Sequence, residues 1–200
     1  MKQFLKYILI TSVIFCSKAY CDKIEVTVTL KPEGMWSDDE KTLIQDAAEK
    51  TFRRLALAEV ANCGYRNAKK ENKDKLRKDW GNKIPVINKS RKVHIEINKK
   101  SLGNGVLGQA EVDRAHINRT NYTLENLSID LSQEAMFAYL TKTPGIEKKD
   151  LWVNIIAHEV AHNLGFRHGS GSSWSENYPH YFVTEIGYCA MSSGTHGSEK

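Results

Sequence analysis

The 200-residue chain has a mass of 22.7 kDa, contains 40% hydrophobic and 26% charged residues, and carries a formal net charge of +5. This length fits a single domain and excludes a large multidomain enzyme, while the ordinary hydrophobic content and small net charge exclude an intrinsically disordered protein. No stretch reaches the ~18 apolar residues that a membrane-spanning helix requires.

Residues 1–21 have the layout of a secretory signal peptide. Basic residues precede an apolar run over Tyr7–Phe15, and small residues follow near two candidate cleavage positions, after Ala19 and after Cys21. The apolar run is too short for an uncleaved membrane anchor. We therefore expect a secreted protein, extracellular or periplasmic, whose residues 22–200 form one domain.

Two cysteines, Cys63 and Cys189, remain after removal of that segment. An even number of cysteines in an oxidising compartment favours a disulfide between them. The alternative is a pair of unrelated buried thiols.

The first half of the remaining chain predicts a strand followed by a long helix. Ile24–Leu30 alternates apolar and polar residues and is rich in β-branched side chains, which is the pattern of a half-buried strand. Ser37, with Glu40 three residues later, forms a capping-box pattern, and apolar residues recur behind it at helical spacing. We expect one long helix from Ser37 to about Asn62–Gly64.

The segment Arg66–Lys92 is strongly basic, with eleven lysines and arginines against three acidic residues. Such a run can bind nucleic acid or an acidic surface. It contains few aromatic residues, however, and matches no recognisable nucleic-acid-binding module. We interpret it as solvated helix and loop surface and expect no nucleic-acid partner.

Further strands and a short helix follow. The alternating residues of Val93–Ile97 and of Leu127–Leu131 predict two strands, and a glycine-rich turn leads into another strand over Gly103–Val112. Ser132–Leu140 predicts a short helix. The order strand, helix, strands, helix predicts an α+β (mixed α/β) domain.

The segment Asp150–Gly165 contains candidate metal ligands and a candidate general base. Its apolar residues recur at helical spacing, which predicts a helix packed into the core with Asp150 as its N-cap. His158 and His162, four residues apart, lie on one face of such a helix, where both imidazoles can reach one Zn²⁺ ion. Glu159 can then act as general base on the metal-bound water, the role of the glutamate in an HExxH motif.

The motif continues through Gly165 to a third histidine, His168. Gly165 is expected to end the helix in a left-handed conformation, so that the chain turns back and His168 approaches the same ion. Three histidines and a water then complete a tetrahedral catalytic zinc site.

The run HEVAHNLGFRH resembles the zinc-binding signature of the metzincin superfamily of metalloendopeptidases, and its residues are most similar to those of the adamalysin branch. The resemblance implies a twisted, mostly parallel sheet with a long N-terminal helix and a zinc-site helix. It also implies a methionine in a tight turn beneath the metal, here Met191. The wall of the specificity pocket is expected from the segment Ser170–Tyr188.

The resemblance further implies an edge strand along which an extended peptide aligns antiparallel, and Val106–Val112 is similar to that strand. The residues expected to pair with substrate are Val106, Leu107, Gly108, Gln109 and Ala110.

By this resemblance we expect a monomeric, secreted endopeptidase with one catalytic Zn²⁺ ion, protein or peptide substrates, and Glu159 as general base. The alternative is a zinc-binding pseudoenzyme or peptide-binding module without turnover. The intact Glu159 argues against that alternative, because loss of the base is the usual mark of a pseudoenzyme.

Overall fold

The computed structural model describes residues 24–68, 73–89, 92–103, 105–118, 123–143, 145–168 and 181–192. The predicted signal peptide, residues 1–21, lies outside the described residues, as do residues 170–180 of the expected pocket wall. Among the helices of the described part, none combines the length and apolar character needed to cross a membrane.

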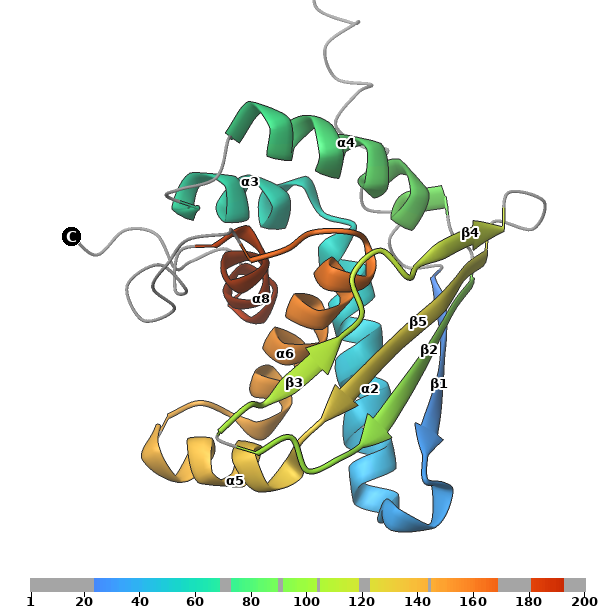
Figure 1. Ribbon diagram of the computed structural model, residues 1–200, viewed down its shortest axis with the longest axis vertical. Coiled ribbons are helices and arrows are strands. Elements are labelled where there is room, and N and C mark those ends of the chain that lie inside the picture. Colours follow the sequence, from blue (N-terminus) through green and yellow to red (C-terminus); the bar gives the residue numbers. More distant parts are fainter. Residues whose placement is uncertain are drawn as a thin grey trace, which may run out of the picture.

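A five-stranded mixed sheet forms one layer of the domain (Figure 1). Its long strands, β1 (Glu25–Lys31), β2 (Lys92–Lys99) and β5 (Thr123–Leu131), run parallel in the order β1-β2-β5. The short strands β3 (Gly108–Ala110) and β4 (His116–Asn118) both pair antiparallel with β5. The mixed α/β class expected from the order of elements is confirmed.

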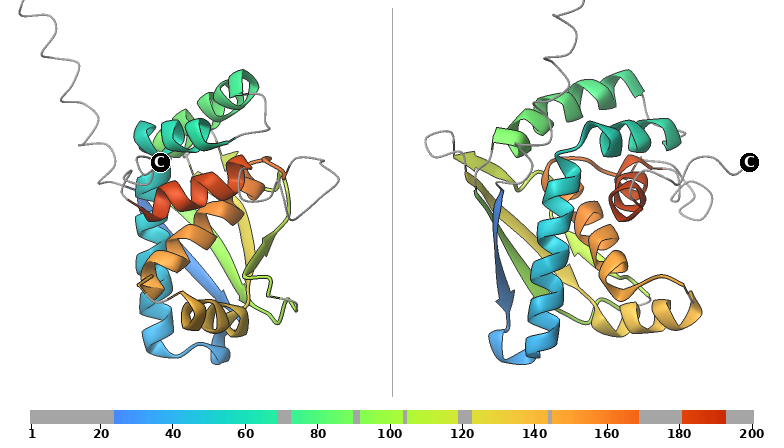
Figure 2. Two further views of the ribbon diagram at one scale, coloured as in Figure 1. Left: turned by 90° about the vertical axis from the view of Figure 1, so that its left-hand side faces the viewer. Right: turned by 180° about the vertical axis from the view of Figure 1, so that it is seen from behind.

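Helices cover one face of this sheet (Figure 2). The other face carries polar side chains. On β2, the side chains of Val93, Ile95 and Ile97 are buried and alternate with more exposed residues. The polar face carries cross-strand ion pairs, including Lys31 with Glu96 at 2.5 Å. This alternation follows from the two-residue period of a strand and places the core between the sheet and the helices.

The helices pack against one another as well as against the sheet. They are α2 (Asp38–Leu55), α3 (Ala58–Asn67), α4 (Lys73–Lys89), α5 (Gln133–Lys142), α6 (Lys148–Asn163) and α8 (Phe182–Met191), with a 3₁₀ turn, η1 (Glu33–Met35), before α2. Helix α6 lies between α2 and α8 and also contacts β3 and β5, so it occupies the centre of the core.

Helix α2 begins as predicted and ends earlier than predicted. The side chain of Ser37 accepts a hydrogen bond from the Glu40 N–H, and the Glu40 carboxylate accepts one from the Ser37 N–H, which confirms the capping box. The helix ends at Leu55, because Leu57 is extended (φ −83°, ψ 131°). The expectation of one helix to residues 62–64 was therefore wrong.

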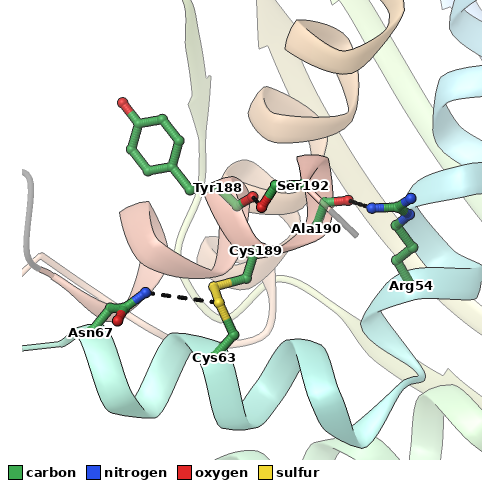
Figure 3. The surroundings of a disulfide bond; sticks show 7 residues. All are labelled: Arg54, Cys63, Asn67, Tyr188, Cys189, Ala190 and Ser192. Atoms are coloured by element: carbon green, nitrogen blue, oxygen red, sulfur yellow. Dashed lines mark hydrogen bonds between the residues drawn. A yellow bond between two sulfur atoms is a disulfide. The ribbon is translucent and has the colours of Figure 1, made fainter. Parts of the chain in front are cut away.

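The break between α2 and α3 has a tertiary cause. No glycine or proline stands at the break, so local propensity does not require it. The change of direction lets α3 pack against α8, where Gly64 lies so close to Phe182 that an added Cβ would approach the ring to 3.0 Å. The sulfur atoms of Cys63 and Cys189 form a disulfide across the same contact (Figure 3), which confirms the expected pairing.

Most of the basic segment forms α4. Trp80 and Ile87 are fully buried beneath this helix, and the Trp80 ring lies 5.4 Å from that of Phe182. Arg77 and Lys78 are exposed. Helix α4 is thus anchored by apolar residues and presents basic side chains to solvent, as expected of a solvated helix surface.

Candidate metal centre

Helix α6 places His158 and His162 one turn apart on the same face. Their ring centroids are 5.0 Å apart, and only 8% and 7% of the two residues is exposed. Burial follows from the position of α6, which is covered by α2, α8 and two strands. The two imidazoles are therefore held by a helix that neighbouring elements enclose.

The start of α6 differs from the prediction. Glu147 is the N-cap residue, and Asp150, expected to be the cap, lies in the first turn. The Asp150 carboxylate instead accepts a hydrogen bond from Lys50 Nζ at 2.5 Å, which forms an ion pair between α6 and α2. The tertiary partner on α2 explains why this acidic residue does not cap the helix.

The end of α6 brings the third histidine back to the first two. Gly165 has φ 102°, a conformation that favours glycine, and its N–H donates to the His162 carbonyl at 2.9 Å. The Phe166 N–H donates to the Ala161 carbonyl at 3.1 Å, which completes a Schellman motif. His168 Nε2 then lies 3.2 Å from His162 Nε2, as the predicted turn requires.

The three histidines form a cluster that can bind a metal ion. One ring nitrogen of each residue lies within 4.8 Å of the others. Burial, together with the two neighbouring imidazoles, holds the pKa of His158 well below its usual range, and burial lowers the pKa of His162. Burial and His162 lower the pKa of His168 to about 4. Neutral imidazoles are the form that coordinates metals.

Glu159 lies beside this cluster against the edge strand. Its exposed fraction is 5%, and an added Cβ on Gly108 would lie 2.9 Å from Glu159 Oε1. Burial, and to a smaller extent the carboxylate of Asp130, raises the pKa of Glu159 to about 8. A carboxylate with so little solvation and a raised pKa is suited to accepting and returning a proton.

A cleft of about 800 Å³ opens over the histidines and Glu159. Its floor is formed by α6, and its walls come from the segment 105–112, from α5 and from α8. The lining residues that the structure describes are Gly105, Val106, Leu107, Gly108, Gln109, Ala110, Val112, Tyr139, Leu151, Asn154, Ile155, His158, Glu159, His162, Arg167, His168, Thr184 and Tyr188. All five residues expected to pair with a peptide are among them.

Only part of the expected edge segment is a strand. Gly108–Ala110 forms β3 and pairs with β5, whereas Val106 and Leu107 precede it. The Leu107 carbonyl accepts from the Ser132 N–H at 3.0 Å, which fixes the segment beside the start of α5. In the described part of the sheet, β3 is the last strand of the order β1-β2-β5-β3.

Met191 lies in a different local structure from the one expected. It is the last residue of α8, so residues 188–191 do not form the tight turn that the resemblance implied. Arg54, at the end of α2, donates to the Ala190 carbonyl at 2.7 Å (Figure 3). It also donates to the Met191 carbonyl at 3.1 Å and so caps α8. Asn154, one turn before His158 on α6, approaches the Met191 sulfur at 4.0 Å.

Sequence reasoning missed the buried Asn163, which fixes the end of α6. Its Oδ1 accepts from the Ser128 N–H at 2.9 Å, and its Nδ2 donates to the Glu111 carbonyl at 2.8 Å. These bonds tie the histidine-bearing turn to β5 and to the segment after β3. The sequence shows only an asparagine among the apolar residues of a predicted core helix. Its burial is known only from the structure, and its partners lie more than thirty residues away in sequence.

Comparison of the chain with models of known protein families, with curated protein sequences and with solved structures gives no match. The function is therefore inferred from the site itself.

Proposed function

We propose that this protein is a secreted zinc-dependent endopeptidase of the metzincin type. The observation that carries the proposal is the meeting of three imidazoles and one buried carboxylate in a cleft bordered by an edge strand. The Cys63–Cys189 disulfide and the signal-peptide pattern of residues 1–21 support export to an oxidising compartment.

The histidine cluster fits zinc. Zn–N distances of about 2.0–2.1 Å in a tetrahedral site put neighbouring nitrogens roughly 3.3–3.4 Å apart, and the two Nε2 atoms of His162 and His168 are 3.2 Å apart. His162 Nδ1 lies 2.7 Å from the Phe166 carbonyl, so Nδ1 is the protonated nitrogen and Nε2 keeps its lone pair for a metal. Three neutral imidazoles suit zinc better than magnesium or calcium, which prefer oxygen ligands.

Zinc bound here would lower the pKa of a coordinated water toward ~7, polarise the scissile carbonyl and favour the ionised form of Glu159. Glu159 then takes the proton of the attacking water at a carboxylate oxygen and later delivers it to the leaving amine. Its position against Gly108 directs this exchange to the side of the cleft where the edge strand lies.

The segment 105–110 aligns the peptide. Backbone groups on the cleft side of an edge strand can pair with an extended chain, and pockets for alternate side chains then give selectivity. Since β3 already pairs with β5 on its other side, the peptide would lie between β3 and α6, over the histidines and Glu159.

Metal removal and restoration tests the proposal. The purified secreted protein should contain about one zinc ion per chain and cleave an internally quenched peptide library. Chelation should abolish cleavage, and added Zn²⁺ should restore it. A zinc-loaded protein that binds peptides but cleaves none would contradict the proposed endopeptidase activity and favour the peptide-binding module instead.

A further inference from the structure

The cleft contains one charged residue that the proposed chemistry does not use. Arg167 lies between Phe166 and His168, is exposed, and lines the cleft. Apart from the histidines and Glu159, it is the one lining residue in the described ranges with an ionic side chain. Arg114, by contrast, does not line the cleft and pairs with Glu111 at 3.0 Å.

Among the residues that the structure describes, Arg167 forms no ion pair or hydrogen bond. A guanidinium presents a planar fork of donors that matches a carboxylate in a bidentate geometry. A cation at the rim of a largely apolar cleft, without a carboxylate partner in the ranges that the structure describes, is placed to receive an acidic group from a ligand.

Hydrogen bonds along the chain show at which end of the cleft Arg167 lies. The Asp113 N–H donates to the His162 carbonyl at 2.9 Å, and an added Cβ on Gly165 would lie 3.1 Å from Asp113 Oδ1. The C-terminal end of the edge segment, at Val112, therefore lies next to the turn that leads to Arg167. The opposite end, near Leu107, is joined through Ser132 to α5, which carries Tyr139.

The direction of the edge segment fixes the direction of the peptide. A peptide antiparallel to residues 105–112 has its N-terminal half near Val112 and its C-terminal half near Gly105. Glu159, which acts on the cleaved bond, lies against Gly108, between these two ends. Arg167 is then beside the residues that precede the cleaved bond.

We propose that Arg167 selects acidic peptides by pairing with an aspartate or glutamate on the N-terminal side of the bond that is cleaved. This inference rests on the proposed function, because it uses the peptide direction and the cleavage point. The opposite end of the cleft, lined by Leu107, Tyr139 and Leu151, accepts apolar side chains after the bond.

Matched peptides test the selectivity. Quenched peptides that differ only in glutamate, glutamine or lysine before the cleaved bond are compared by kcat/KM for the wild type and for Arg167→Ala, Arg167→Lys and Arg167→Glu. A charge-assisted hydrogen bond predicts a wild-type preference for glutamate over glutamine of roughly tenfold or more. The ratio of kcat/KM for the glutamate peptide to that for the glutamine peptide should fall to about one in Arg167→Ala and remain above one in Arg167→Lys. Arg167→Glu should instead prefer the lysine peptide.

Arg114→Ala is the matched control, because it removes an arginine from the same end of the molecule but outside the cleft, and it should keep the wild-type ratio. Zinc content, measured for each variant, reports whether the neighbouring His168 still binds metal. A wild type without acidic preference, or a preference that survives Arg167→Ala in zinc-loaded protein, would overturn the inference.

Binding separates this inference from the proposed function. Fluorescence anisotropy of a labelled acidic peptide is measured with Glu159→Gln and with Glu159→Gln/Arg167→Ala, neither of which should cleave it. Weaker binding in the double variant supports the role of Arg167 even if the wild type cleaves no peptide, in which case only the endopeptidase proposal fails. If the wild type cleaves the peptide and the two variants bind it equally well, the endopeptidase proposal stands and the acidic selectivity is overturned.

Discussion

Replacing Gly108 by alanine tests how closely the edge strand must approach Glu159. An added Cβ would lie 2.8 Å from Ile155 Cγ2 and 2.9 Å from Glu159 Oε1, whereas ordinary contact begins at 3.4 Å. The strand or the two side chains must therefore move by about half an ångström. Overpacking of this kind costs about 1–3 kcal/mol of unfolding free energy.

The same shift should reduce activity. A misplacement of about 1 Å near the chemistry can lower the rate roughly 100-fold, so half of that displacement predicts a loss of roughly tenfold in kcat/KM. Zinc content should not change, because none of the three atoms closest to the added Cβ belongs to a histidine.

Urea unfolding and hydrolysis of a quenched peptide measure the two effects. Gly34→Ala is the control, because an added Cβ at Gly34 meets no heavy atom within 4 Å. If Gly108→Ala is as stable and as active as Gly34→Ala, the close approach of the strand to Glu159 contributes neither to stability nor to activity.

Three further predictions concern the metal ligands and the packing around them. Because the pKa of His168 is lowered to about 4 and those of the other two imidazoles are also lowered, protons should compete weakly with zinc. Competitive titration should find less than about tenfold weaker affinity at about pH 5.5 than at about pH 7.5, whereas a loss near the roughly thousandfold expected of three ordinary imidazoles would contradict the shifts. Replacing Cys63 and Cys189 together by serine opens a link across 126 residues and should lower the free energy of unfolding in urea by about 2–5 kcal/mol; a change below ~1 kcal/mol would show that the disulfide adds little. Asn163→Ala removes the partners of the Ser128 N–H and of the Glu111 carbonyl, so the same measurement should give a loss of at least ~2 kcal/mol, and an unchanged midpoint would argue against this anchoring role.

The histidine cluster was predictable from sequence because it depends on local geometry. The four-residue spacing of His158 and His162 puts both on one helix face whatever the rest of the fold does. Gly165 then reverses the chain within three residues, through hydrogen bonds to the last turn of the same helix. No long-range information is needed to bring His168 near the other two.

The features that could not be predicted depend on contacts between distant segments. The break after Leu55 follows from packing of α3 on α8, and Asp150 fails to cap α6 because Lys50 binds it. Met191 stays helical where Arg54, 137 residues earlier in the sequence, supplies hydrogen bonds to the end of α8. The closeness of Gly108 to Glu159 also arises only once β3 is paired with β5.

The most direct test of the proposed function compares the wild type with Glu159→Gln. Glutamine keeps the size of the side chain but cannot accept the proton of the attacking water. We expect equal zinc content, close to one ion per chain, and a loss of kcat/KM of at least ~100-fold on a quenched peptide in the variant. Equal zinc content with undiminished cleavage by Glu159→Gln would contradict the assignment of Glu159 as general base and, with it, the proposed endopeptidase mechanism.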